Sequence, residues 1–292
     1  MNIQEKKILL TGSTGMLGQA LLVEILKKNG YKIYFISHSK SYPNSVANQL
    51  TLRDVENHQF YAFFHCAAEV NVNLCENNLE HAKSVNCEYT KLLFEKVFSE
   101  FSFYISTDSV YGGDEGNYNE INDVSPVNNY ARSKLMGEKV AANYTDNLYI
   151  IRTNIFGENS KSKSSIFEWA KRELLMGNSI PGFSNIFFNP LSVSHLSLIL
   201  LSMLEKKLNF GIYNIGSDSY ISKYEFLVKI AEFLGANSQL VKPTKFLASH
   251  GVANRPFNTT MNCDKIKQNL INPDLSFQRS LDLLMKTKNE EN

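Results

Sequence analysis

Three side chains near the middle of the chain have the types and spacing needed to move a proton at a carbonyl or alcohol oxygen. Tyr130 and Lys134 are four residues apart, so in a helix they lie on one face, one turn from each other. Thr107 comes before them, at the end of a predicted strand, and its hydroxyl would orient the oxygen. Hydride transfer to a carbonyl, or from an alcohol, requires such a proton donor or acceptor and a group that holds the oxygen.

Tyr130 needs a lowered pKa for this role. The pKa of a free tyrosine is about 10, which makes it a poor acid or base at neutral pH. The ammonium group of Lys134 and a cationic oxidised nicotinamide both favour the phenolate, so both lower the pKa of the Tyr130 hydroxyl. The alternative is a surface helix, because the pattern Tyr-x-x-x-Lys is common by chance. The functional interpretation therefore depends on the elements around the pair.

A cofactor site beside these residues is predicted by the stretch KKILLTGSTGMLG at 6–18. Its apolar run, Ile8 to Leu10, has the character of a buried parallel strand, and Met16 to Lys28 has helical periodicity. Between them, glycines at GxxGxxG spacing permit a tight bend and a close approach to a pyrophosphate, which the helix N-terminus binds. An ordinary strand-to-helix turn is the alternative. The predicted cofactor contacts here are Gly12, Thr14, Gly15, Met16, Leu17 and Gly18.

The second predicted strand, Tyr31 to Ile36, indicates which dinucleotide is preferred. An NAD site usually has Asp or Glu about 20 residues beyond the glycines, where the carboxylate binds the ribose 2′-hydroxyl. Here the strand is followed by Ser37, His38, Ser39 and Lys40. Hydroxyl, imidazole and ammonium groups can bind a 2′-phosphate, which a carboxylate would repel. We therefore expect NADP(H), with NAD as the alternative cofactor and a solvated loop as the alternative structure.

The third predicted strand, Tyr61 to His65, runs into small residues that let the chain pass close to a cofactor. We add Ala67 and Ala68 to the cofactor contacts, together with Tyr130 and Lys134, although close helix packing would also explain the alanines. The other elements predicted from periodicity are helices at Leu79 to Phe98, from Tyr130 onward, at Ile166 to Met176 and at Val193 to Leu204, and strands at Phe101 to Ser106 and at Ile212 to Ile215.

Composition excludes several classes of protein. The chain has 292 residues, 43% hydrophobic and 20% charged, with a net charge of +1. Without a basic block, this balance gives no reason to expect nucleic acid or an anionic membrane as a partner. We find no signal-peptide core and no stretch long enough to span a membrane. The four cysteines lack metal-site spacing, so we expect a soluble cytoplasmic protein with reduced thiols and no metal.

These motifs together resemble the extended short-chain dehydrogenase/reductase family over nearly the whole chain. The stretches that carry the resemblance are TGSTGMLG at 11–18, HCAA at 65–68, VN at 85–86, STDSVYG at 106–112, YARSK at 130–134 and RTNIFG at 152–157. Three later stretches look most like dTDP-4-dehydrorhamnose reductase and its nucleotide-sugar relatives: NPLSVSHLS at 189–197, GIYNIGSDSYISKYEF at 211–226 and RPFNTTMNCDKI at 255–266. The resemblance implies that Thr107, Tyr130 and Lys134 are the catalytic trio.

Position 109 separates the activities found in this family. The nucleotide-sugar 4,6-dehydratases have the pattern TDE there, whose Asp and Glu serve water loss, and the fucose-type epimerase/reductases resemble SSC, with a Cys as acid and base. This chain has Thr107-Asp108-Ser109, so it lacks a group at 109 that ionises near neutrality. The activity that remains is simple reduction of a 4-keto group, which needs only the catalytic trio. The rhamnose-pathway reductases more usually have an aromatic residue at 109, which leaves the particular sugar open.

The resemblance and the order of the elements predict an α/β fold: a Rossmann-type doubly wound parallel sheet with a smaller, discontinuous C-terminal substrate lobe. We expect residues 1–155, completed by parts of 189–216, to bind the dinucleotide, and 156–292 to form mainly the substrate lobe. Four aromatic side chains of this lobe are candidates for stacking on a nucleotide base, with packing in the lobe core as the alternative: Trp169, Phe183, Phe187 and Phe188.

The predicted function is therefore NAD(P)H-dependent reduction of a nucleotide-linked 4-keto-6-deoxy sugar. Arg255 is a candidate for the substrate diphosphate, because a guanidinium fits phosphate oxygens; a surface arginine is the alternative. The other candidate substrate contacts are Glu69, Asp108, Ser109 and Asn154. Two further functions stay open: a nucleotide-sugar epimerase on the same fold, and a non-catalytic NADP-binding regulatory subunit, like the methionine adenosyltransferase partner that resembles this family. The sugar, the nucleotide and the oligomeric state, a homodimer included, also stay open.

Overall fold

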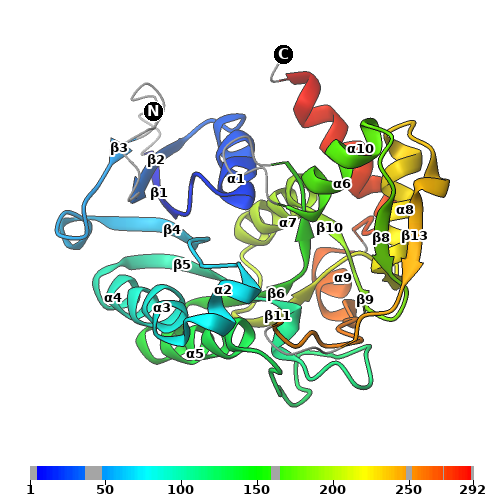
Figure 1. The fold of residues 1–292 in the computed structure, drawn as a ribbon. Helices are drawn as coiled ribbons and strands as arrows, with labels where there is room; N and C mark the ends of the chain where they lie inside the picture. The colour runs from blue at the N-terminus through cyan, green and yellow to red at the C-terminus, as the bar shows by residue number, and fades with distance from the viewer. Residues whose placement is uncertain (1–4, 37–47, 159–164, 248–251, 272, 291–292) are drawn as a thin grey trace. The chain divides into compact units, whose positions relative to one another are not determined.

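The structure is a computed structural model that describes residues 5–36, 48–158, 165–247, 252–271 and 273–290. It divides into two compact units (Figure 1). Unit 1 comprises Met1–Thr107, Asn129–Arg152 and Ser197–Tyr213, and unit 2 comprises Asp108–Asn128, Thr153–Leu196 and Asn214–Asn292. The chain thus passes between the two units several times.

Unit 1 is built on a seven-stranded sheet with the order β11-β6-β5-β4-β1-β2-β3. The pairs from β3 across to β6 are parallel. The order β3-β2-β1-β4-β5-β6 is that of a doubly wound dinucleotide-binding sheet, in which the strand order reverses between β1 and β4. The predicted α/β fold is confirmed. The strands are β1 (Lys6–Thr11), β2 (Tyr31–Ile36), β3 (Asn48–Gln49), β4 (Gln59–His65), β5 (Phe98–Ile105), β6 (Leu148–Thr153) and β11 (Gly211–Ile215).

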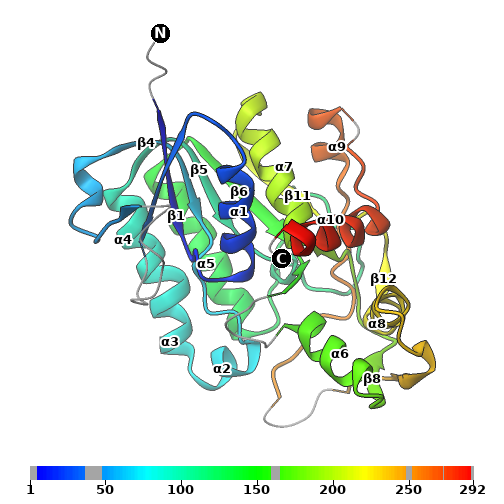
Figure 2. The same ribbon diagram turned by 90° about the horizontal axis from the view of Figure 1, so that it is seen from above.

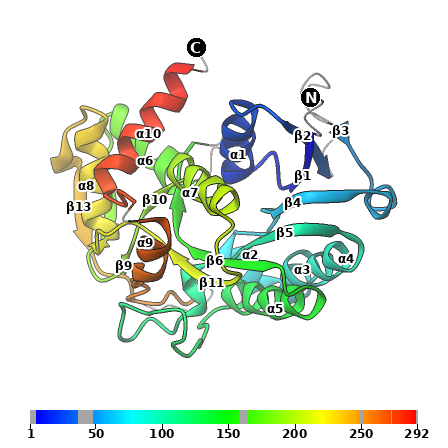
Figure 3. The same ribbon diagram turned by 180° about the vertical axis from the view of Figure 1, so that it is seen from behind.

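Helices cover both faces of this sheet, which explains why its strands are continuous apolar runs. Ile8, Leu9 and Leu10 of β1 are completely buried, as is typical of a parallel strand packed on both sides. Helix α1 lies over one face, and α3, α4 and α5 lie over the other (Figures 1 and 3). The helices and helical turns of unit 1 are α1 (Met16–Leu26), η1 (Val55–Asn57), α2 (Val72–Asn77), α3 (Leu79–Lys83), η2 (Ser84–Glu88), α4 (Tyr89–Lys96), α5 (Asn129–Tyr144) and most of α7 (Val193–Lys206).

The predicted helix from Leu79 to Phe98 is wrong in two respects. It is interrupted by η2, a π-helical turn, and it ends at Lys96. Val97 is extended, with φ −94° and ψ 119°, and Phe98 already belongs to β5, where it pairs with Gln59. Helical periodicity does not reveal a π-turn, because the inserted residue only shifts the phase of the pattern.

Unit 2 has short strands and helices around its own apolar core. Helix α8 packs against α6, β8 and β13, and Figure 2 shows α8 with α6 and β8. Phe156, Phe167, Phe188 and Phe226 are among the buried core residues. Both α6 and α8 begin with a Ser–Glu capping box. The elements are η3 (Asp108–Val110), β7 (Ile155–Phe156), α6 (Ile166–Leu175), β8 (Ile180–Phe183), β9 (Phe187–Phe188), β10 (Leu191–Ser192), β12 (Ile221–Ser222), α8 (Lys223–Phe233), η4 (Ser238–Leu240), β13 (Val241–Thr244), α9 (Asp264–Leu270) and α10 (Phe277–Glu290).

The part of the chain that the structure describes contains no helix that is both long and apolar enough to cross a membrane.

Candidate active site

The glycine turn lies at the carboxyl ends of β1 and β4, where the strand order reverses. Gly12 has φ +67°, and a Cβ there would come within 2.6 Å of the Ala67 backbone nitrogen. A Cβ on Gly18 would come within 2.2 Å of the Gly12 carbonyl oxygen. Both positions therefore exclude any side chain, because the turn, the start of α1 and the chain after β4 are in direct contact. This bare backbone fits the pyrophosphate cradle predicted from the sequence.

Some of the other predicted cofactor contacts lie in the part of the chain that the structure describes, and some do not. Met16 and Leu17 open α1, directly after its N-cap Gly15. The Thr14 carbonyl accepts a hydrogen bond from Gln19 Nε2 at 3.3 Å. The predicted contacts to the adenosine ribose, Ser37, His38, Ser39 and Lys40, lie outside the described residues.

His65, at the end of β4, is held as a neutral imidazole. Burial lowers its pKa to about 3. The Thr90 hydroxyl donates to the Asn86 carbonyl at 2.9 Å, so at 3.0 Å it must accept from His65 Nε2. His65 Nδ1 then accepts from the Thr11 hydroxyl at 2.7 Å. A single chain of hydrogen bonds, Thr11 to His65 to Thr90 to the Asn86 carbonyl, thus connects the ends of β1 and β4 to the π-helical turn.

Asn86, in the π-helical turn η2, directs its side-chain amide toward the start of α5. Asn86 Nδ2 donates to Ser133 Oγ at 2.9 Å and to the Glu69 carbonyl at 3.0 Å, and Asn86 Oδ1 accepts from Glu69 N at 2.8 Å. Ser133 Oγ in turn donates to the Tyr130 carbonyl at 2.8 Å. The Glu69 carboxylate accepts from Asn71 N. Asn86 therefore fixes the first turn of α5, which carries Tyr130.

The helix α5 places Tyr130 and Lys134 on one face, as predicted. Tyr130 is partly exposed, whereas Lys134 is only 3% exposed. Lys134 Nζ lies 4.2 Å from the centroid of the Tyr104 ring, and the Tyr104 hydroxyl donates to the Lys134 carbonyl at 3.1 Å. Burial lowers the pKa of Lys134 to about 7, while the Glu138 carboxylate acts in the opposite direction. The pKa of Lys134 is thus close to neutral pH, so its ammonium and neutral amine forms can both be populated there.

Glu138, one turn beyond Lys134, connects α5 to the strands that end at the site. Its carboxylate accepts from Arg152 Nε at 3.1 Å and Nη2 at 2.8 Å, and also from the Ser106 hydroxyl. Glu138 and Arg152 are both 3% exposed. Ser106 directly precedes Thr107, so this carboxylate fixes α5 relative to the residue that would orient the carbonyl. The sequence analysis missed Glu138, although its i+4 spacing from Lys134 places it on the same helical face.

The lowered pKa of Lys134 predicts a pH-dependent stability effect. An unfolded lysine keeps its proton up to about pH 10.5, whereas folded Lys134 releases it at about 7. Between these values the unfolded chain binds more protons, so the folded form gains stability as the pH rises. Lys134→Met removes this penalty, so its free energy of unfolding should exceed that of the wild type by more at pH 6 than at pH 9.5. Urea denaturation of cofactor-free protein at both pH values measures the difference.

Lys139→Met, which changes an exposed lysine of the same helix, is the matched control and should show no such pH dependence. A stability gain in Lys134→Met that is equal at the two pH values would contradict the assignment.

In unit 2, three of the predicted substrate contacts come together around a buried carboxylate. Asp108 is 1% exposed, and its Oδ2 accepts from Asn154 Nδ2 at 2.8 Å and from Thr259 Oγ1 at 2.5 Å. Ser109 Oγ donates to Asp108 Oδ1 at 3.3 Å. Arg255 is partly buried, which lowers the pKa of its guanidinium. The sequence analysis missed Thr259, whose neighbours in space come from distant parts of the chain.

The aromatic candidates for base stacking are mostly core residues. Phe188 is 2% exposed and belongs to the unit 2 core, and Trp169 packs against that core. Phe183 packs edge-on against Phe246. Phe187 is 37% exposed. Phe188 and Trp169 are therefore packing residues of the lobe core, whereas part of the Phe187 side chain is exposed.

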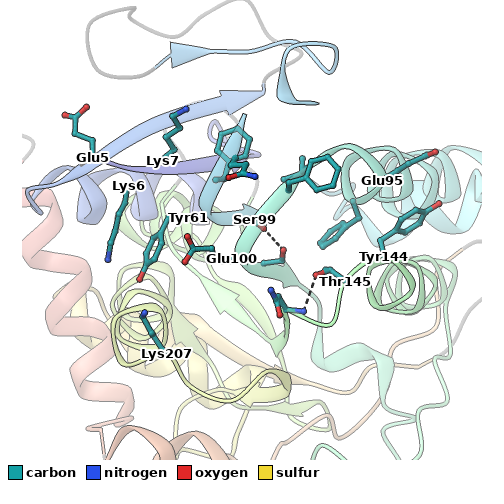
Figure 4. Close-up of a pocket in the computed structure, with 17 residues that line it drawn as sticks. Glu5, Lys6, Lys7, Tyr61, Glu95, Ser99, Glu100, Tyr144, Thr145 and Lys207 are labelled. Atoms are coloured by element: carbon teal, nitrogen blue, oxygen red, sulfur yellow. Dashed lines mark hydrogen bonds between the residues drawn. The ribbon is translucent and has the colours of Figure 1, made fainter. Parts of the chain in front are cut away.

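A cavity of about 950 Å³ in unit 1 lies away from all these residues (Figure 4). It is lined by the amino ends of β1, β4 and β5, with Lys6 Nζ 4.0 Å from the centroid of the Tyr61 ring. The glycine turn lies at the carboxyl ends of the same strands, which is the edge where doubly wound sheets bind ligands. None of the predicted site residues lines this cavity.

The four cysteines are free thiols. Burial raises the pKa of the Cys66 thiol to about 12, so it is not a nucleophile at neutral pH. Within the described ranges, no group of three or more His, Cys, Asp or Glu side chains is arranged to hold a metal ion.

Comparison with known proteins gives one family over almost the entire chain. The model of the RmlD substrate binding domain family matches residues 6–289. Methionine adenosyltransferase 2 subunit beta from Danio rerio is 28% identical over 277 residues, which is 90% of this chain and 84% of the relative. Probable low-salt glycan biosynthesis reductase Agl14 from Haloferax volcanii is 23% identical over 283 residues, 89% of this chain and 91% of the relative.

Solved structures with the same fold include one dTDP-4-dehydrorhamnose reductase and one hypothetical dTDP-4-dehydrorhamnose reductase. dTDP-4-dehydrorhamnose reductase from Bacillus anthracis, crystallised with NADP, has a TM-score of 0.82 and 22% identity, covering 97% of this chain and 99% of that one. A hypothetical dTDP-4-dehydrorhamnose reductase from Sulfolobus tokodaii has a TM-score of 0.79 and 26% identity, covering 95% and 98%. The resemblance predicted from the sequence motifs is confirmed.

Proposed function

The chain belongs to the RmlD substrate binding domain family, and from that premise we propose that it is an NADP(H)-dependent reductase of a nucleotide-linked 4-keto-6-deoxy sugar. The observation that carries the proposal is the anchoring of α5 against the end of β5 by Glu138 and Tyr104. Within unit 1, this fixes the helix of Tyr130 and Lys134 relative to the end of β5, which Thr107 follows by two residues. A reductase needs these three groups held rigidly around one oxygen.

Each residue of the trio has one role in this proposal. Tyr130 donates a proton to the oxygen of the carbonyl as it becomes an alkoxide. Thr107 donates a hydrogen bond that orients the carbonyl. Lys134 holds the ribose of the cofactor and lowers the pKa of the Tyr130 hydroxyl. The bound dinucleotide supplies the hydride, and the glycine turn at 12–18 binds its pyrophosphate.

Reduction fits the strand-end motif better than water loss or epimerisation. Ser109 lacks a side chain that ionises near neutrality. The Asp108 carboxylate accepts hydrogen bonds from Asn154 and Thr259, which argues against a role as the base for water loss. Asp108, Ser109, Asn154 and Arg255 in unit 2, and Glu69 in unit 1, are the proposed substrate contacts.

The test of this function is NADPH oxidation, followed by absorbance, against a panel of nucleotide-linked keto sugars. We expect turnover with at least one 4-keto-6-deoxy sugar, and the corresponding 6-deoxy alcohol as product by mass spectrometry. Loss of water from a nucleotide-linked 6-hydroxy sugar would identify a dehydratase. Inversion without net NADPH consumption would identify an epimerase.

A preference for NADPH over NADH is expected from the residues after β2. No carboxylate follows Ile36 at 37–40, and the ammonium of Lys40 would bind the 2′-phosphate. Fluorescence titration should therefore give tighter binding of NADPH than of NADH. Lys40→Ala should weaken NADPH binding by roughly 10-fold or more and leave NADH unchanged. Tighter binding of NADH by the wild type would reverse the cofactor assignment.

A second candidate function is a cofactor-binding regulatory subunit without turnover. It is favoured by the 28% identity to a protein named as a subunit of methionine adenosyltransferase 2. Such a subunit needs the dinucleotide cradle but has no need of a proton donor. Mutation of Tyr130 therefore separates the two functions.

A further inference from the structure

Lys223 is a cation at a position that disfavours positive charge. It is the first residue of α8, directly after the N-cap Ser222, and the N-terminus of a helix repels cations. Its Nζ lies 3.2 Å from the centroid of the buried Phe188 ring. Among the residues that the structure describes, no hydrogen bond or ion pair reaches this ammonium. Burial lowers the pKa of Lys223 to about 7.

Arg255 is a second cation at the same end of the strand layer that holds Lys223. In this layer, β12 pairs with β9 so that Ser222 is opposite Phe187, and Lys223 N donates to the Ile186 carbonyl at 2.8 Å. Phe187 is bridged in turn to Asn258 in a parallel direction. Arg255 precedes Asn258 by three residues, so it extends past the end of β9 on the side of Lys223. The charge of Arg255 accordingly lowers the pKa of Lys223 further.

The nearby negative charge does not neutralise this pair. Asp108 is the one carboxylate that acts to raise the pKa of Lys223 among the described groups. Its Oδ2 already accepts from Asn154 and Thr259. Glu225, the acidic residue in the first turn of α8, is occupied by the backbone N–H and hydroxyl of Ser222. The one carboxylate that raises the pKa of Lys223 is therefore already engaged by two other donors.

We infer that Lys223 and Arg255 form one oxyanion site in unit 2, which binds the diphosphate of the substrate. Two cations in segments that flank β9, one at the start of α8 and one before Asn258, match a group with two negative phosphates. A nearby anion would remove the electrostatic cost of holding them together. The ammonium supplies donors that rotate, and the guanidinium supplies a fixed fork. This inference rests on the proposed function for the identity of the anion, and it assigns a role to Lys223, which the sequence analysis did not single out.

Binding of dTDP and UDP, measured by calorimetry on the full chain, tests this site. Lys223→Met should bind the preferred diphosphate at least roughly 10-fold more weakly than the wild type, because a charged hydrogen bond is lost. Lys223→Arg should recover most of the affinity. Lys229→Met, which changes an exposed lysine of the same helix, should bind as the wild type does. Thymidine and inorganic pyrophosphate, measured alongside, separate the contribution of the base from that of the phosphates.

Equal affinity of Lys223→Met and the wild type for both diphosphates would overturn the site. So would a failure of the wild type to bind either diphosphate at millimolar concentration, or an equal loss of thymidine and dTDP affinity in the variant. Unfolding of both Lys223→Met and Lys223→Arg would show that the lysine is structural and would also reject the site.

The result is separable from the test of the reaction. Diphosphate binding that depends on Lys223, without turnover of any keto sugar, would reject the proposed reduction and leave the site standing. Turnover with unchanged diphosphate affinity in Lys223→Met would reject the site alone.

Discussion

Tyr130→Phe is expected to lower keto-sugar turnover by about 10²–10⁴-fold, the usual contribution of a positioned general acid. The substitution removes one oxygen and keeps the ring. The hydrogen bond from Ser133 Oγ to residue 130 uses the backbone carbonyl, which is unchanged. The fold and the affinity for NADPH should therefore remain those of the wild type. Steady-state turnover and a fluorescence titration of NADPH measure the two quantities on the same preparation.

Lys134→Met provides the contrast to Tyr130→Phe. The same ammonium is proposed to hold the ribose and to lower the pKa of the Tyr130 hydroxyl, so NADPH affinity and turnover should both fall. An unchanged rate in Tyr130→Phe would remove Tyr130 from the mechanism. The regulatory-subunit function would then be preferred, and the variant should leave a partner's activity unchanged.

The local parts of the site could be predicted from the sequence because each depends on residues close together in the chain. The turn after β1 requires glycines at 12 and 18, and the structure shows that a Cβ at either position would collide with backbone. Tyr130 and Lys134 are one helical turn apart, so their common face follows from the helix alone. The core strands were visible as apolar runs, since both of their faces are buried.

The parts that were missed depend on contacts between distant segments. The environment of the Lys223 ammonium is set by the ring of Phe188 on β9 and by the charges of Asp108 and Arg255, which act on its pKa. The strands of unit 2 are two to four residues long, too short for a periodic pattern. The true end of the helix at Lys96 is set by the pairing of Phe98 with Gln59 in the sheet, which overrides local propensity.

Glu138→Gln is expected to lower the free energy of unfolding by about 3–5 kcal/mol, the usual cost of removing one partner from a buried ion pair. The side chain keeps its shape, so the loss comes from the missing charge. The buried Arg152 guanidinium would then lack the carboxylate that accepts from its Nε and Nη2. A surface pair provides the control: Glu80→Gln breaks an exposed contact with Lys83 on α3 and should change stability little. Urea denaturation of both variants measures the difference.

The same substitution should reduce turnover by more than the loss of folded protein explains. Glu138 raises the pKa of Lys134, so without its charge the ammonium form becomes rarer at pH 7 and Tyr130 loses part of its activation. The rate should therefore recover when the pH is lowered toward 6, where Lys134 is protonated again. A rate that is lowered equally at pH 6 and pH 8 would show that Glu138 acts only by anchoring α5 to Ser106 and Arg152.

The double variant Glu138→Leu/Arg152→Met separates the anchoring from the charge. Replacing both buried ions with apolar side chains removes the desolvation cost of each, so stability should recover by several kcal/mol relative to Glu138→Gln. Turnover should stay low, because no carboxylate remains beside Lys134. Recovery of both stability and turnover would contradict an electrostatic role for Glu138 and leave it as a structural partner of Arg152.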